Sequence, residues 1–131
     1  MAKLTQEQLL EIFNALKKEV KPYEKGAIKA RIDIEGKYEL WSERPKVFVH
    51  SKTRNEVSFA ALILQRSYVG FYYMPVYTNT EEVRGKLAPG LLKHLKGKSC
   101  FHIKAIDEDL LKQVKEAMKI GYEEYKKNGW V

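Results

Sequence analysis

Apolar residues near the start of the chain recur every three or four positions, and this spacing predicts an amphipathic helix. Thr5 and Gln8 have the spacing of a capping box, in which each side chain bonds the backbone N–H of the other residue. Pro22 is expected to end the helix, because the residue before a proline is disfavoured in the helical conformation. The apolar stripe consists of Leu9, Ile12, Phe13, Leu16 and Val20.

A second helical pattern occupies the end of the chain. Asp107 is the expected N-cap residue, and the acids at 108–109 fall in the first turn. Their negative charges there interact favourably with the positive end of the helix dipole. Lys126 and Lys127 fall at the opposite end, and Gly129 follows the expected stop. The apolar stripe here is Leu110, Leu111, Val114, Ala117, Met118, Gly121, Tyr122 and Tyr125.

Between the two helices, apolar and polar residues alternate, which is typical of antiparallel strands with one face in water. Every second residue from Ile28 to Ile34 is apolar, so these side chains are expected on one face. The segment 56–66 is apolar on both faces and is expected to be the central strand, joined to 69–74 by a hairpin. Further strands are expected at 38–41, 47–50 and 100–103, and short helices at 80–83, capped by Thr80, and at 91–95.

This order of elements predicts an α+β fold. The N- and C-terminal helices would pack on one face of an antiparallel sheet of about five to six strands, as a two-layer sandwich whose other sheet face is largely open. The length of 131 residues suits a single domain, 1–131, with its own core.

The cysteine content and the apolar runs predict the compartment. Cys100 is the only cysteine, which excludes an intramolecular disulfide and agrees with a reducing environment. The sequence has no signal-peptide pattern and no run of the roughly 20 apolar residues that cross a bilayer. A cytoplasmic location without membrane contact is therefore expected.

The net charge of +7 favours anionic partners, and its distribution is uneven. The segment 83–104 carries Arg84, Lys86, Lys93, Lys96, Lys98 and Lys104 and no acid. We call it the basic segment. It lacks the interleaved aromatic residues that stack on bases, which disfavours nucleic acid as a partner.

The sequence favours a binding role over catalysis. It contains no phosphate-binding glycine loop and no zinc motif of the usual spacing. Cys100 and His102 would share a strand face, but packing is the more common reason for such a pair. His50 and His102 lie in expected strands and would share a ligand or a metal if those strands converge. One hypothesis is a small-ligand or anion site between the sheet and the basic segment; its contacts would be Arg66, Tyr72, His102 and Lys104.

A protein partner at the open sheet face is the other hypothesis from the residues. Alternation places Tyr68 and Tyr72 on one face of the sheet and Phe71 and Tyr73 on the other. Trp41 shares a face with a charged residue, Glu39, which leaves two positions for it: on the open side of the sheet, or folded over the rim of the core. An exposed tryptophan on the open side would suggest a surface for a partner.

Three segments resemble the YdhG-like family of small bacterial domains, some of which are grouped with frataxin-type iron chaperones. They are VSFAAL at 57–62, VGFYYM at 69–74 and GKSCFHIK at 97–104, which a Leu-rich helix follows. The likeness extends roughly over residues 19–130. It implies a helix–sheet–helix sandwich, iron as a ligand, and a sheet face that meets the iron–sulfur assembly machinery.

The same resemblance implies a weak iron site on the first helix and the first strand. The matching acids are Glu7, Glu11, Asp33 and Glu35. Basic residues interrupt this set, and their positive field opposes capture of a cation. They are Lys17, Lys18, Lys29, Arg31 and Lys37.

Overall fold

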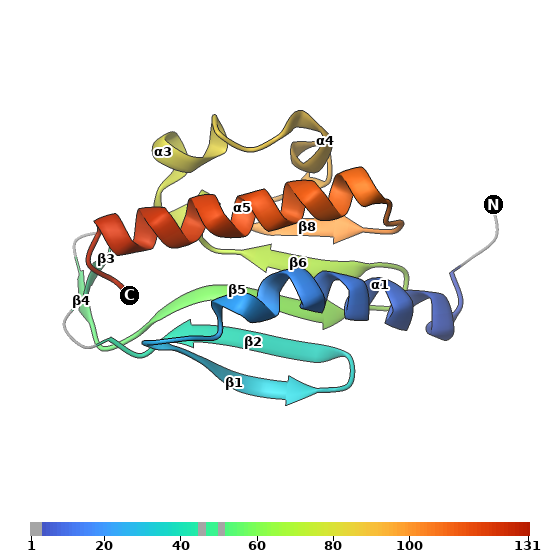
Figure 1. Ribbon diagram of the computed structural model, residues 1–131, viewed down its shortest axis with the longest axis horizontal. Coiled ribbons are helices and arrows are strands. Elements are labelled where there is room, and N and C mark those ends of the chain that lie inside the picture. The colour runs from blue at the N-terminus through green and yellow to red at the C-terminus, as the bar shows by residue number, and fades with distance from the viewer. Residues whose placement is uncertain (1–3, 45–46, 50–51) are drawn as a thin grey trace.

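Two long helices lie on one face of an antiparallel sheet (Figure 1). The computed structural model describes residues 4–44, 47–49 and 52–131. The helices are α1 (Gln6–Val20) and α5 (Glu108–Lys127), and they contact each other above the sheet. The α+β prediction, with a helix at each end of the chain, is confirmed. No helix of the described residues is long and apolar enough to cross a membrane.

The main sheet has six strands in the order β1-β2-β5-β6-β8-β7, and every neighbouring pair is antiparallel. Its strands are β1 (Ile28–Ile34), β2 (Lys37–Ser42), β5 (Val57–Leu64), β6 (Val69–Tyr73), β8 (Cys100–Ile103) and β7 (Leu95–Lys96). A separate hairpin consists of β3 (Val47–Val49) and β4 (Lys52–Arg54), and the short helices are η1 (Lys21–Tyr23), α2 (Pro75–Thr78), α3 (Thr80–Arg84) and α4 (Pro89–Leu92).

The predicted N-cap residues of both long helices are confirmed. The Thr5 hydroxyl accepts a hydrogen bond from the Gln8 backbone N–H at 3.0 Å, and the Gln8 side chain accepts one from the Thr5 N–H at 2.9 Å. Asp107 accepts one from the Leu110 N–H at 2.7 Å. Each cap satisfies backbone donors that have no partner inside the helix.

Three expectations about the smaller elements were confirmed only in part, because a strand (Val47–Val49) and two short helices form near the expected places but differ in detail. The strand expected at 47–50 pairs with β4 and not with the main sheet, and its last residue, His50, lies outside the described residues. Residues 91–95 do not form one helix: α4 ends at Leu92, and Leu95 pairs with Phe101 in β7. Gly97 permits this hairpin because it adopts a positive φ of 79°. The N-cap of α3 is Asn79, not Thr80, whose hydroxyl donates to the Tyr77 carbonyl.

The expectation that Ile28 to Ile34 share one face was wrong. Ala30 lies opposite Leu40, but Ile32 lies opposite Glu39, because the strand pair contains a bulge between Ala30 and Ile32. A bulge inserts one extra residue into the strand, so every side chain after it points to the opposite face of the sheet. Ile32 therefore points to the open side of the sheet.

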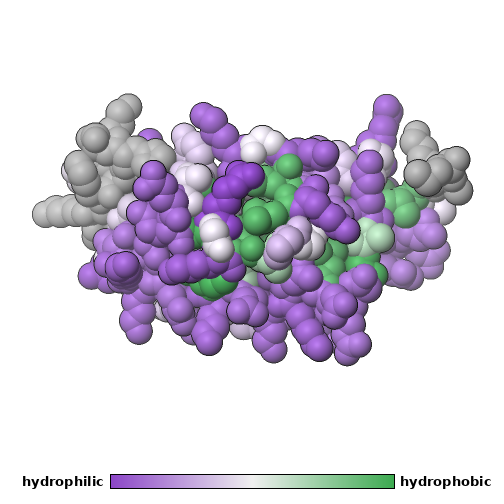
Figure 2. Space-filling model, turned by 90° about the horizontal axis from the view of Figure 1, so that it is seen from above, coloured by the Kyte–Doolittle hydropathy of each residue, from purple (hydrophilic) through white to green (hydrophobic). Residues whose placement is uncertain are grey.

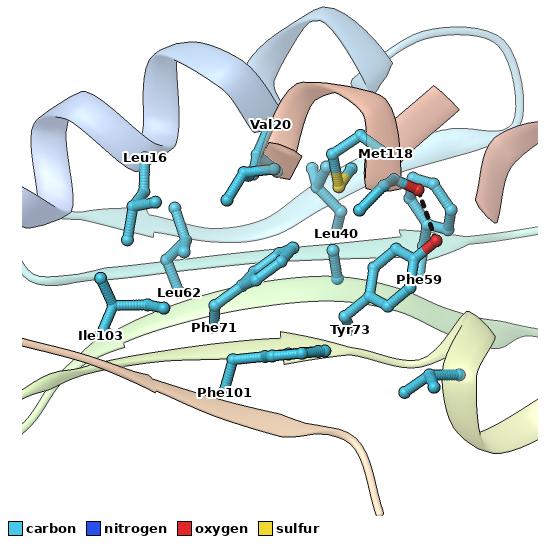
Figure 3. Close-up of a cluster of buried hydrophobic side chains, with 14 of the residues drawn as sticks. Leu16, Val20, Leu40, Phe59, Leu62, Phe71, Tyr73, Phe101, Ile103 and Met118 are labelled. Carbon is cyan, nitrogen blue, oxygen red and sulfur yellow. Dashed lines mark hydrogen bonds between the residues drawn. The ribbon is translucent and has the colours of Figure 1, made fainter. Parts of the chain in front are cut away.

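Aromatic rings dominate the core between the sheet and the helices. Phe71 and Phe101 lie on neighbouring strands of the face that α1 covers (Figure 3), with ring centroids 5.7 Å apart. The buried hydroxyls have partners: Tyr73 donates to the Ala117 carbonyl, and Tyr125 donates to the Ser58 carbonyl at 2.7 Å. The core is therefore apolar, and these two buried hydroxyls are satisfied. Among the described residues, Gln113 Oε1 is a buried side-chain atom without a hydrogen-bond partner.

Candidate functional site

The sheet face that points away from α1 and α5 is the candidate surface, and we call it the open face. The strand register fixes its residues. Ala61 lies opposite Tyr72, which lies opposite Cys100, and one step along, Gly70 lies opposite His102. The open face bears Ile32, Ile34, Glu39, Trp41, Ser58, Ala61, Ile63, Gly70, Tyr72, Cys100 and His102.

A group of stacked rings lies on the β6–β8 half of the open face. The rings of Tyr68 and His102 stack with centroids 3.9 Å apart and 13° between their planes. The Tyr72 ring covers Gly70, where a Cβ atom would lie 2.7 Å from the tyrosine Cε2 atom. Gln65 Nε2 donates to the Tyr72 hydroxyl at 3.3 Å. Glycine at position 70 therefore allows the tyrosine to lie flat on the sheet.

Trp41 lies on the other half of the open face, which is one of the two positions that the sequence left open. Its indole N–H donates to Glu39 Oε1 at 2.5 Å. The Arg31 guanidinium lies 4.7 Å from the centre of the ring and forms ion pairs with Glu43 and Glu56. These contacts hold the half-buried indole in one orientation.

The four residues of the predicted ligand site lie on or beside the open face, at one end of the sheet. Tyr72 and His102 are on neighbouring strands. Arg66 lies in the turn between β5 and β6, and Lys104 follows β8; both are exposed. The structure thus brings the residues to one region. A ligand site at these four residues stays a prediction.

Clefts beside the basic segment are closed by α5 rather than by the sheet. One is lined by Lys86 and Leu87 together with Glu116 of α5, and another by Lys93 together with Asp107. Figure 2 looks onto the edge of the molecule that carries α3 and α4 and shows hydrophilic side chains around an apolar centre. The sequence did not predict these clefts, because the residues that line them are far apart along the chain.

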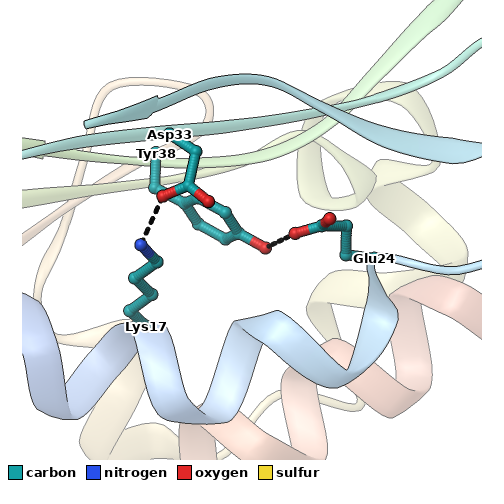
Figure 4. Close-up of polar contacts among 4 residues, drawn as sticks. All are labelled: Lys17, Glu24, Asp33 and Tyr38. Carbon is teal, nitrogen blue, oxygen red and sulfur yellow. Dashed lines mark hydrogen bonds and ion pairs between the residues drawn. The ribbon is translucent and has the colours of Figure 1, made fainter.

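The acids of the predicted iron site do not come together. Glu7 and Glu11 are exposed on α1, and Glu35 is exposed in the turn after β1. Asp33 Oδ1 lies 2.5 Å from Lys17 Nζ beside the Tyr38 ring (Figure 4). The hydrogen bond from Lys17 lowers the pKa of Asp33.

A search of the described residues for three or more His, Cys, Asp or Glu side chains that could hold a metal ion finds none. Iron at Glu7, Glu11, Asp33 and Glu35 therefore stays a prediction from the family resemblance. His50 lies outside the described residues, so a pairing with His102 also stays a prediction.

The environment of Cys100 does not favour a nucleophile. Burial raises the pKa of the thiol, whereas a reactive cysteine needs a lowered one. The His102 ring stacks on Tyr68, and the register places His102 opposite Gly70 rather than beside a base or substrate cleft. These contacts match packing, the alternative that the sequence favoured.

Comparison of the chain with protein-family models, with characterised proteins and with solved structures finds no significant match.

Proposed function

We propose that this chain is a non-catalytic binding domain that docks a protein of the iron–sulfur assembly machinery on its open face. The observation that supports docking is the set of apolar and aromatic side chains on a sheet face that no described element covers. The family resemblance supplies the class of partner.

The composition of the open face suits a protein partner. Ile34 is 62% exposed, and Trp41 and Tyr72 are half-buried. The Trp41 indole N–H and the Tyr72 hydroxyl each form a hydrogen bond within the chain. Rigid aromatic side chains of this kind contribute large contact area with little loss of conformational entropy. An exposed apolar group rimmed by polar residues is typical of interaction sites.

The charges around the open face favour a partner with an acidic surface. Lys37, Lys96 and Lys104 lie on the face or at its rim, and Arg66 lies at the end of the sheet. None of these four forms an ion pair with a carboxylate among the described residues. Complementary rim charge speeds encounter and selects the partner more than it adds affinity.

The docking proposal is tested with purified scaffold and cysteine desulfurase proteins of iron–sulfur assembly, by calorimetric titration. Ile34→Ser combined with Ile63→Ser removes apolar area from the open face. We expect about tenfold weaker binding or more, equivalent to about 1.4 kcal/mol.

The matched control is Leu111→Ser combined with Ile120→Ser, which changes half-buried residues of α5 in the helix layer. This control should bind as the unchanged chain does. Absence of binding to both purified proteins, or equal binding by the open-face variant, would reject the proposal.

Iron binding is the second part of the proposed function and is supported by the resemblance alone. Ferrous iron is titrated while the heat and the tyrosine and tryptophan fluorescence are followed. If the acids bind iron, Glu7→Gln combined with Glu11→Gln reduces the heat. Glu81→Gln with Glu82→Gln, which changes exposed acids of α3, does not. No heat at high micromolar iron would remove this part and leave docking untouched.

A further inference from the structure

Tyr77 lies between two clefts at the end of the sheet where β6 leads into α2. Its side chain is 36% exposed and lines both clefts. The first reaches the open face at Trp41, and the second reaches the turn between β7 and β8 at Lys98. Their volumes are about 170 and 340 Å³, so together they reach the lower part of the roughly 300–1,000 Å³ range of small-molecule sites.

The second cleft is cationic. Arg84 at the end of α3 and Lys98 line it, and Lys98 Nζ lies 5.7 Å from the centre of the Tyr77 ring. No carboxylate is among its described lining residues, and neither cation is ion-paired within the described part of the chain. An anion held there would interact with both charges, and the guanidinium could bind it in bidentate geometry. The rest of the lining is Val76, Thr80 and Gly97.

The neighbouring clefts contain acidic side chains, unlike the described lining of this one. The cleft beside Lys93 also contains Asp107 and Asp109, and the cleft beside Lys86 also contains Glu116. A carboxylate next to a lysine cancels much of the field that an anion would experience. Among these clefts of the basic segment, the one at Arg84 therefore suits an anion best.

The first cleft offers a surface for an apolar ring. Trp41, Met74 and Tyr77 line it, and the indole is held by its contacts with Glu39 and Arg31. Aromatic side chains and a thioether pack well against a flat ring. The other lining residues are Arg54, Glu56, Val57, Ser58 and Thr78.

We propose that the two clefts form one site for a small ligand that joins an aromatic ring to a phosphate group, as a mononucleotide does. The ring would pack between Trp41 and Tyr77, and the phosphate would bind Arg84 and Lys98. This site does not rest on the docking proposal: both use Trp41, but the ligand site also needs Tyr77, Arg84 and Lys98, which docking does not involve.

Binding is tested with AMP, adenosine and inorganic phosphate on the full chain. Trp41 reports on the first cleft, because the other tryptophan, Trp130, is only 6% exposed. We expect AMP to quench the fluorescence and to bind about tenfold more tightly, or better, than adenosine or phosphate alone. Equal affinity for AMP and phosphate would exclude the ring cleft, and equal affinity for AMP and adenosine would exclude the anion cleft.

Charge variants test the position of the site. Arg84→Gln combined with Lys98→Gln should weaken AMP binding by about tenfold or more. The matched control, Lys86→Gln combined with Lys93→Gln, removes the same charge from the same segment and should change the affinity by less than about twofold. An equal loss in the control, or no AMP binding by the unchanged chain at about 1 mM, would overturn the proposal.

Tyr77→Ser tests the ring half of the site. We expect AMP affinity to fall toward the affinity for phosphate alone, with phosphate binding unchanged. A variant that keeps full preference for AMP over phosphate would show that Tyr77 does not contact the ring, and the proposal would fail. Circular dichroism of each variant checks that the fold is retained.

Discussion

The two faces of the sheet consist of the same strands and differ in what covers them. On the face below α1 and α5, Phe71, Tyr73 and Phe101 are fully buried. On the open face, Tyr72 and Cys100, which are their neighbours along the strands, are only half-buried. Alternation along a strand thus separates two tasks, because one set of side chains stabilises the fold and the other remains available for contacts.

The polar groups of the two faces differ in the same way. Between the sheet and the helices, the hydroxyls of Tyr73, Tyr125 and Ser42 donate to backbone carbonyls of the chain itself. On and beside the open face, Lys96 and Lys104 extend toward solvent. Polar groups that bond within the fold add to stability, whereas exposed cations add little stability and attract anionic partners. The predictions below test this division.

The largest contrast is expected between two neighbouring residues of β5. Leu62 is fully buried below the helices, and Ile63 is half-buried on the open face. Leu62→Ala should lower the free energy of unfolding by about 2–5 kcal/mol, because it leaves a cavity in the core. Ile63→Ala should lower it by about 1 kcal/mol or less. Urea denaturation measures both, and equal effects would contradict the division between the faces.

A second contrast concerns the buried tyrosines at high pH. Burial raises the pKa of Tyr73 and of Tyr125 above the ordinary value of 10.0. The two hydroxyls therefore lose their protons at a lower pH in the unfolded chain than in the folded one. The stability that the protonated hydroxyls contribute is fully present below pH 10 and is lost as the pH rises. Between pH 9 and pH 11 we expect a loss of about 1.4 kcal/mol for each tyrosine.

The control for this prediction is Tyr73→Phe combined with Tyr125→Phe. The double variant is less stable at pH 9, because two buried hydrogen bonds are removed. Between pH 9 and pH 11, however, the free energy of unfolding of the variant should fall less than that of the unchanged chain. The difference between the two decreases should be about 3 kcal/mol. Parallel curves for the two proteins would show that these hydroxyls ionise in the folded state as readily as in the unfolded chain.

The sequence predicts the covered face far better than the open face. The stripes of α1 and α5 and the caps at Thr5 and Asp107 depend on local spacing, and the structure confirms them. The bulge after Ala30 depends on pairing with a distant strand, and no residue pattern in β1 signals it. One inserted residue was enough to move Ile32 and Ile34 from the expected core to the open face.

The candidate sites show the same limit. Alternation was sufficient to separate Tyr72 from Phe71 and Tyr73, but it did not show which side was open. It could not bring Trp41 and Arg84 to either side of Tyr77, because the turns after β6 and β7 decide where those chain segments lie. The ion pair between Asp33 and Lys17 likewise depends on the bulge, which turns Asp33 toward α1.

A third prediction concerns the contact between α5 and the covered face. A Cβ atom at Gly121 would lie 2.6 Å from the Tyr73 hydroxyl and 2.6 Å from Pro75 Cγ. Gly121→Ala should therefore destabilise the fold by about 1–3 kcal/mol, although alanine favours the helix. Gly85 has no atom within 4 Å of the same position and a φ of −68°, so Gly85→Ala should be neutral or slightly stabilising. Thermal unfolding of both variants separates packing from helix propensity.

The smallest effect is expected at the rim of the covered face, where Lys17 binds Asp33. Their side chains are 24% and 42% exposed, so solvent screens the pair, and Asp33→Asn should cost less than about 1 kcal/mol. Because the pKa of Asp33 is lowered, this stability is present above the unfolded-state pKa and is lost as the pH falls through the folded value. Glu35→Gln, two residues along, is the control and should change the unfolding free energy less. If Asp33→Asn is as damaging as Leu62→Ala, a charged rim contact contributes as much as the apolar core, and the division between the two faces fails.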